Sequence, residues 1–193
     1  MSDVMQDRQN NRKVFWKTVS AFFLSHIGGL LIAIIFCFGL SSLFEGYGFL
    51  IVIPVVLFLY SYPIYSSMWN AGHRDLNSAQ FGHTVLHRER GFLYGIVGSV
   101  PIMLISLCFV LSKFGLFFNF VIPYKLLNAE IWPIINVMTS SPYLPDFAVW
   151  QIFLIAFLSI AVPIVIGELG YLAGTYDFAV MQRLVYKNKD KKK

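Results

Sequence analysis

The fold of this chain is decided by a polar segment, residues 69–90, whose sequence is WNAGHRDLNSAQFGHTVLHRER. The segment holds three of the four histidines, and a long apolar run lies on each side of it. Only 13% of the chain is charged and 57% is hydrophobic, whereas soluble domains are usually about 25% charged. The sequence therefore predicts a membrane protein whose polar chemistry is gathered in this segment.

Four apolar runs are long enough to cross a bilayer as helices, which takes about 20 residues. They cover approximately residues 18–44, 49–69, 91–112 and 147–174. The first run is too long for a signal-peptide core, and no small-residue cleavage pattern ends it, so we expect it to be retained. The prediction is an all-α polytopic integral membrane protein with four transmembrane helices in a single bundle domain, residues 18–182.

The positive charges predict the orientation of the bundle. All lysines and arginines except Lys113 and Lys125 fall in the N-terminal segment 1–17, the loop 70–90 or the basic tail 183–193. Because cytoplasmic segments are enriched in these residues, we expect a multi-pass protein of the cell (inner) membrane with both termini and the loop in the cytoplasm. Basic residues beside the anionic lipids of the inner leaflet are each worth about 1 kcal/mol. The net charge of +5 thus points to membrane lipids as partners, and we expect no nucleic acid.

The outer segment, residues 113–146, is apolar but interrupted by four prolines and by Lys125, Asn128 and Glu130. No stretch in it reaches about 20 apolar residues. We therefore expect an extracytoplasmic cap with one interfacial helix near 126–138. The alternative is a re-entrant segment or a pair of half-spans.

Two ionisable residues, His26 and Glu168, fall inside predicted spans at similar depth from the cytoplasmic end. An ionisable group within a membrane is costly, and is a functional candidate by default. We hypothesise that the two side chains face each other and share a proton or a polar ligand. The alternative is that Glu168 lies close enough to the interface to be solvated.

The polar segment offers candidates for contact with a partner or a lipid head group. Its arginines suit phosphate oxygens, because a guanidinium binds them bidentately. Arg74 and Asp75 are expected to form an internal ion pair, or Asp75 to cap a helix; a solvated loop is the alternative for the whole segment. The candidate contact residues are Trp69, His73, Arg74, Asp75, Asn77, His83, His87, Arg88 and Arg90.

His83 and His87 are four residues apart, so a helix would place them on one face, where His73 could complete a metal-ligand set. The same spacing is typical of an amphipathic helix lying on the leaflet. No H-E-x-x-H motif accompanies the histidines. We expect the leaflet-lying helix, with no metal and no cofactor.

Small residues indicate where helices pack closely. Gly91, Gly95 and Ser99 recur every four residues in the third span, and Gly170 and Gly174 do so in the fourth. This spacing lets helix backbones approach each other. The pattern Ala-Gly-x-x-Asp-x-x-x-x-Gln also occurs twice, over 71–80 and 173–182. It indicates either a repeat of two similarly oriented hairpins or two chance helix exits.

Residues 69–77, together with 81–83, 90–92 and the ending 184–187, resemble a pattern in small uncharacterised membrane proteins of Gram-positive bacteria. The resemblance implies a location in a bacterial inner membrane. It implies no activity.

The sequence contains no nucleophile elbow, no Walker loop and no paired catalytic carboxylates, so we do not expect an enzyme. The first functional hypothesis is a non-enzymatic accessory or scaffold subunit that docks a membrane protein, or another copy of the chain, through the loop 70–90. The alternative is a small transporter or channel component that uses His26 and Glu168. A membrane enzyme acting on lipid or prenyl substrates is a third class.

Overall fold

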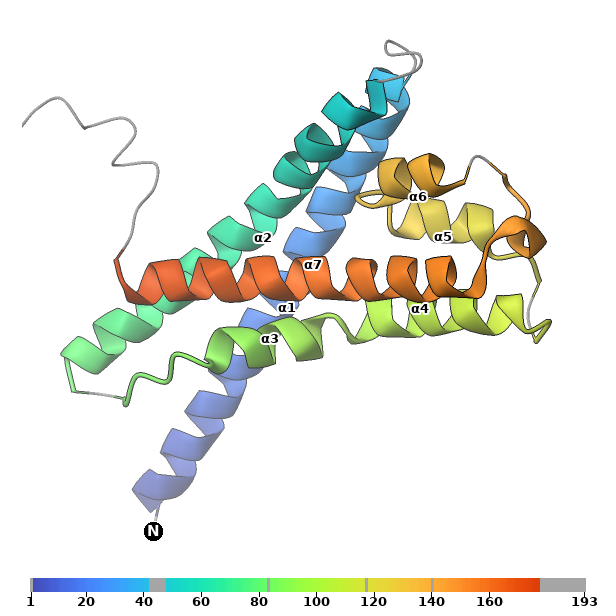
Figure 1. Cartoon of the computed structure of the whole chain (residues 1–193). Helices are drawn as coiled ribbons and strands as arrows, with labels where there is room; N and C mark the ends of the chain where they lie inside the picture. The colour runs from blue at the N-terminus through green and yellow to red at the C-terminus, as the bar shows by residue number, and fades with distance from the viewer. Residues whose placement is uncertain (1, 42–47, 83, 117, 140, 178–193) are drawn as a thin grey trace, which may run out of the picture.

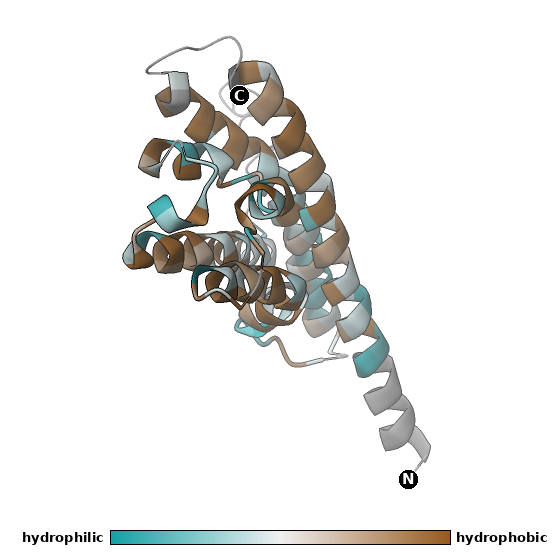
Figure 2. Ribbon diagram, turned by 90° about the vertical axis from the view of Figure 1, so that its right-hand side faces the viewer, coloured by the Kyte–Doolittle hydropathy of each residue, from teal (hydrophilic) through white to brown (hydrophobic). Residues whose placement is uncertain are grey.

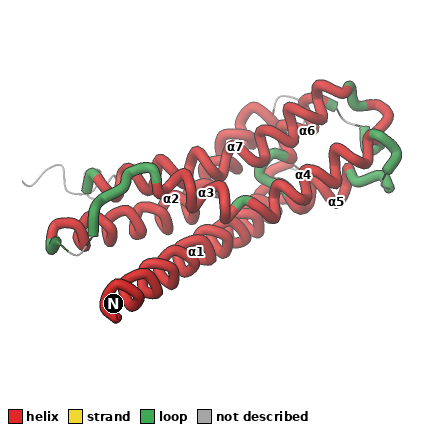
Figure 3. Tube along the Cα trace, turned by 90° about the horizontal axis from the view of Figure 1, so that it is seen from below, coloured by secondary structure: helices red, strands yellow, loops and turns green. Residues whose placement is uncertain are grey.

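The computed structural model describes residues 2–41, 48–82, 84–116, 118–139 and 141–177. These residues form helices and loops, and none of them forms a strand (Figure 3). In chain order the elements are α1 (Ser2–Ser41), α2 (Phe49–Gln80), α3 (Arg90–Gly98), α4 (Val100–Lys113), α5 (Val121–Leu127), α6 (Trp132–Met138), the short 3₁₀ helix η2 (Leu144–Asp146) and α7 (Val149–Thr175).

The helices form two crossing hairpins (Figure 1). In the first, α1 packs along α2; in the second, α3 and α4 pack in succession along α7. The hairpins cross where α2 meets α7 and α1 meets α3, and α5 and α6 lie in the angle between them. The start of α1, the loop 81–89 and the end of α7 all lie at one end of the bundle (Figure 3).

Three helical segments are long and apolar enough to cross a membrane: Arg12–Leu40, Leu50–Gln80 and Val149–Thr175. The pair α3 and α4 also qualifies when taken as one span bent by 49°. Large apolar side chains are exposed on these helices, among them Leu24, Ile35 and Phe58. Figure 2 shows that hydrophobic residues predominate along the helical ribbons. The all-α class is confirmed, with three candidate spans, or four if the bent pair is one.

The helix that contains the second apolar run does not end with the run at Trp69, because α2 continues for three more turns to Gln80. In those turns Ala71, Gly72 and Asp75 are buried. Ala71 and Gly72 lie on the same helix face as Asp75, since residues three and four apart are neighbours along a helix. Packing against α7 thus extends the helix into the polar segment and shortens the loop to 81–89.

The third run, predicted as one span over 91–112, is broken at Ser99. Pro101 stands in the first turn of α4. Because proline lacks an amide hydrogen, it cannot continue the hydrogen bonding of a preceding helical turn, but it is well suited to begin a new helix. This explains the bend between α3 and α4.

The single helix expected near 126–138 is in fact two helices, α5 and α6, joined by the turn 128–131. Pro133 stands in the first turn of α6, so the same property of proline separates them. The end of the first run, 42–44, and the basic tail 183–193 lie outside the described residues.

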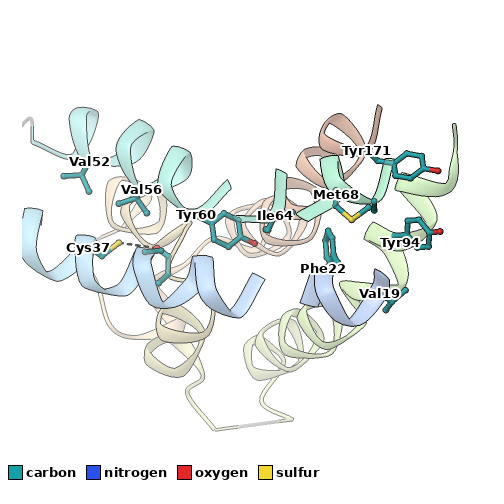
Figure 4. Packing of buried hydrophobic residues seen from close by; sticks show 13 residues of the cluster. Val19, Phe22, Cys37, Val52, Val56, Tyr60, Ile64, Met68, Tyr94 and Tyr171 are labelled. Atoms are coloured by element: carbon teal, nitrogen blue, oxygen red, sulfur yellow. Dashed lines mark hydrogen bonds between the residues drawn. The ribbon is translucent and has the colours of Figure 1, made fainter. Parts of the chain in front are cut away.

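The main core runs between α1 and α2 and continues to the place where the hairpins cross (Figure 4). Phe22 of α1 is fully buried and packs against Gly98 of α3 and Gly167 of α7. Glycine leaves space there for the ring, so three helices meet closely around it. A second cluster joins α4 to α5, with Phe109 and Tyr124 stacked at a centroid distance of 4.1 Å.

Candidate functional site

The carboxylate of Asp75 is the centre of the polar segment. Asp75 lies on α2 and is 8% exposed. Arg74 donates to Oδ1 from Nε at 3.2 Å and from Nη2 at 3.1 Å. The Tyr171 hydroxyl on α7 donates to Oδ2 at 2.9 Å, and Nη1 of Arg90 on α3 lies 4.0 Å from the same oxygen. A buried carboxylate is costly unless it is paired and hydrogen-bonded, and these three groups satisfy it.

This network joins four helices and the loop. Nη2 of Arg74 also donates to Oγ1 of Thr18 on α1, at 3.1 Å. The Tyr171 hydroxyl lies 3.2 Å from the backbone carbonyl oxygen of His87 in the loop. Asp75 is thus an internal ion-pair partner and does not cap a helix, since α2 continues past it. With its oxygens occupied by donors, the carboxylate is arranged to hold structure rather than to accept a substrate proton.

A second set of contacts holds the end of α7. The rings of Trp69 and His73 are stacked, with centroids 5.0 Å apart. Nδ1 of His73 lies 3.2 Å from Oδ1 of Asp177. Nη1 of Arg88 donates to the Tyr176 hydroxyl at 2.6 Å, and its guanidinium carbon lies 4.4 Å from the centre of the Tyr176 ring. The loop and the end of α7 therefore hold each other in place.

The helix expected to align His83 with His87 is not formed, because residues 84–89 are turn and loop. His83 itself lies outside the described residues. Nδ1 of His87 is 3.4 Å from Oε1 of Glu89, and Asn77 is partly buried near the end of α2. In the part of the chain that the structure describes, no three His, Cys, Asp or Glu side chains are grouped so that they could hold a metal ion.

His26 and Glu168 have separate partners. Nδ1 of His26 is 2.7 Å from the Tyr60 hydroxyl, and His26 is buried between α1 and α2. Glu168 lies against α3, where the backbone amide of Phe92 is a donor to its carboxylate and Oε2 would meet any side chain added at Gly91. Oε2 is buried and has no hydrogen-bond partner. The structure therefore does not bring these two side chains together as hypothesised.

The small residues lie at helix contacts. Gly95 of α3 faces Ile164 of α7, and Gly170 of α7 faces Tyr65 of α2. Ser99 is fully buried at the break between α3 and α4 rather than inside a continuous helix.

The glycines of the two copies of the Ala-Gly pattern lie where α2 crosses α7. Residues 178–182 of the second copy lie outside the described residues. A methyl group on Gly72 would overlap the carbonyl oxygen of Tyr171, and one on Gly174 would overlap the carbonyl oxygen of Trp69. The arrangement is symmetric: Tyr171, which Gly72 contacts, is three positions before Gly174, and Trp69, which Gly174 contacts, is three positions before Gly72. The glycine of each copy is therefore a packing residue, and Gly72 does not end its helix.

Several residues of the site were not found by sequence reasoning. Tyr171, Tyr60 and Thr18 were not singled out. Their partners are 96, 34 and 56 positions away in the chain. Tyrosine or threonine within an apolar run is a weak signal, and only folding defines what it contacts.

Comparison with known protein families, with curated proteins and with solved structures finds no match to this chain.

Proposed function

We propose that this chain is a four-span protein of the cell membrane with both termini in the cytoplasm, and that it acts as a non-enzymatic accessory subunit of a membrane complex. Partner docking occurs at the cytoplasmic face of residues 70–90, which comprises the last turns of α2 and the loop 81–89. The basic residues of α1, such as Arg12 and Lys17, lie at the same end of the bundle as the loop, which supports the orientation.

One observation carries the docking proposal: the loop is anchored, yet it exposes large apolar side chains. Phe81 is 77% exposed and Val85 is 73% exposed. Both lie beyond the last turn of α2, whereas most exposed apolar residues lie on the helices that would face lipid. The contacts of His87 with Tyr171 and of Arg88 with Tyr176 hold the loop before any partner arrives. Such pre-organisation lowers the entropy cost of binding.

The test is purification of the full chain in a gentle detergent, followed by native mass spectrometry. We expect a stoichiometric protein complex with the wild type, and its loss in the double variant Phe81→Ser/Val85→Ser. The matched control is Leu116→Ser, which removes a 70% exposed side chain at the other end of the bundle and should leave the complex intact. A wild type without any protein partner, or a complex that survives the double variant, would contradict the proposal.

A small transporter or channel component is the second candidate, and Glu168 favours it. A carboxylate oxygen that is buried within a candidate span and lacks a partner is costly unless it is used. Glu168→Gln keeps the shape of the side chain and removes its charge. If wild-type protein in proteoliposomes transports a cation, the Glu168→Gln variant should not transport it. The protein complex seen by native mass spectrometry should persist in this variant.

A further inference from the structure

Two arginines from different helices, Arg74 of α2 and Arg90 of α3, share one carboxylate. Nη2 of Arg74 lies 3.1 Å from Oδ1 of Asp75, and Nη1 of Arg90 lies 4.0 Å from Oδ2. The carboxylate is buried, but the side chains of the two arginines are 42% and 35% exposed. The fold therefore presents two guanidinium groups close together at the surface of the bundle.

This arginine pair carries more charge and more donors than its contacts within the protein use. Among the described residues, no carboxylate other than that of Asp75 lies within 4.0 Å of either guanidinium group. No hydrogen bond within that part of the chain uses Nη1 of Arg74 or any guanidinium nitrogen of Arg90. Because each guanidinium has five N–H donors, one positive charge and several exposed donors are left for an anion from outside the chain.

The depth of the arginine pair along the bundle is given by Thr18 of α1, whose Oγ1 accepts a hydrogen bond of 3.1 Å from Nη2 of Arg74. After Thr18, the large exposed side chains of α1 are apolar, starting with Leu24. Before it, the exposed side chains of α1 include three basic ones, those of Arg12, Lys13 and Lys17. Such a change from basic to apolar exposure marks the place where a helix enters the hydrocarbon of a bilayer. The arginine pair therefore lies at the level of the lipid head groups.

Nearby residues suit an anionic lipid better than a free ion. Trp16 of α1 and Phe92 of α3 are both 51% exposed, and Phe92 is two residues after Arg90. Tryptophan is enriched at the level where lipid head groups meet the acyl chains. Lys17 adjoins Thr18, and basic residues next to a membrane favour anionic lipids. A free phosphate ion would leave the two aromatic side chains in water.

We propose that Arg74 and Arg90 bind the phosphate group of one anionic phospholipid. Nη1 of Arg74 and the guanidinium of Arg90 donate to the phosphate oxygens, while Nε and Nη2 of Arg74 continue to hold Asp75. Charge-assisted hydrogen bonds of this kind are about twice as strong as neutral ones. The proposal rests on the membrane placement of the bundle given under the proposed function, but not on the docking of a protein partner.

The first experiment measures the Tm of the delipidated full-length protein in a neutral detergent as lipid is added. Phosphatidylglycerol should raise the Tm in a saturable way, whereas phosphatidylcholine with the same acyl chains should raise it much less. Inorganic phosphate should cause no saturable rise, which distinguishes a lipid site from a site for the free ion.

Variants of single arginines assign the effect to the pair. Arg90→Gln should weaken the apparent affinity for phosphatidylglycerol by about tenfold or more, because it removes charge-assisted donors and leaves Asp75 with its two other partners. Arg90→Lys keeps the charge but not the planar fork and should be intermediate. The matched control is Arg88→Gln. It removes the same charge from a guanidinium that already donates to Tyr176, and it should respond to lipid as the wild type does.

The second experiment does not depend on the folding of any variant. Native mass spectrometry of the wild type, released from micelles with equal amounts of the two lipids, should show one phosphatidylglycerol retained per chain in preference to phosphatidylcholine. The double variant Phe81→Ser/Val85→Ser should retain this lipid even where it loses a protein partner, so the two proposals fail separately. Equal retention of the two lipids, a phosphate effect equal to that of phosphatidylglycerol, or equal responses of Arg90→Gln and Arg88→Gln would each overturn the lipid proposal.

Discussion

The hydroxyl of Tyr171 donates a hydrogen bond of 2.9 Å to the carboxylate of Asp75, and this bond joins α7 to α2. The two residues are 96 positions apart, and both lie in the buried part of the crossing between the hairpins. The bond fastens the end of the second hairpin to the helix that leads into the loop. It therefore couples the stability of the bundle to the position of the candidate docking loop.

Tyr171→Phe should destabilise the protein, because it removes a buried hydrogen bond to a charged acceptor. We expect a loss of about 2 kcal/mol, or roughly 4–8 °C in Tm for a chain of this length. Thermal unfolding in detergent measures it. The control is Tyr143→Phe, which removes a hydroxyl from a side chain that is 64% exposed. Equal Tm values for the two variants would show that the bond contributes nothing.

Gly174→Ala should destabilise the protein far more than Gly28→Ala does. A methyl group at Gly174 overlaps the backbone of Trp69, so α7 must move away from α2, whereas Gly28 has no atom within 4 Å of the added methyl. Overpacking costs typically about 1–3 kcal/mol, while alanine in place of an unhindered helical glycine gains up to about 1 kcal/mol. The comparison is made by Tm. A Gly174 variant as stable as the Gly28 variant would contradict the close crossing of α2 and α7.

Tyr60→Phe should destabilise the first hairpin, because it leaves Nδ1 of His26 buried without its partner. We expect a loss of about 1–3 kcal/mol. The double variant His26→Leu/Tyr60→Phe should recover part of it, because replacing both partners by apolar groups leaves no polar atom unsatisfied. The free energy of unfolding is measured for the wild type, both single variants and the double variant, which together form a double-mutant cycle. Additive effects would mean that the two side chains do not interact.

The protein should lose stability as the pH rises through the range in which Glu130 titrates. Burial raises the pKa of Glu130 to about 8 in the folded form and the unfolded form has the ordinary value of 4.5, so between these values the folded state binds more protons. The contribution of this group is fully present below about pH 4.5, declines by up to about 1.4 kcal/mol per pH unit and levels off above about pH 8.

Measurement of Tm against pH for the wild type and for Glu130→Gln tests this dependence. The variant should lack this decline. The same slope in both proteins would assign the pH dependence to other groups.

The helical class and the position of the apolar segments follow from composition and run length, since a stretch of about 20 apolar residues is a helical span wherever it lies. The break at Ser99 and the division of 126–138 into two helices could also have been predicted from the sequence, because Pro101 and Pro133 act locally on the backbone. The prediction missed the first break by treating the third run as uniform, and the second by extending one helix across Pro133.

The sequence by itself determined that the chain is an all-α bundle of long apolar helices, with its polar residues concentrated in 69–90, because hydrophobicity and helix length are local properties. Only the tertiary structure decided that α2 continues to Gln80, that Asp75 meets Tyr171, that His26 meets Tyr60 instead of Glu168, and that Glu130 is buried without a partner. Each of these depends on which helix faces cross, and the crossing at Gly72 and Gly174 is set by the close approach of two backbones far apart in the chain.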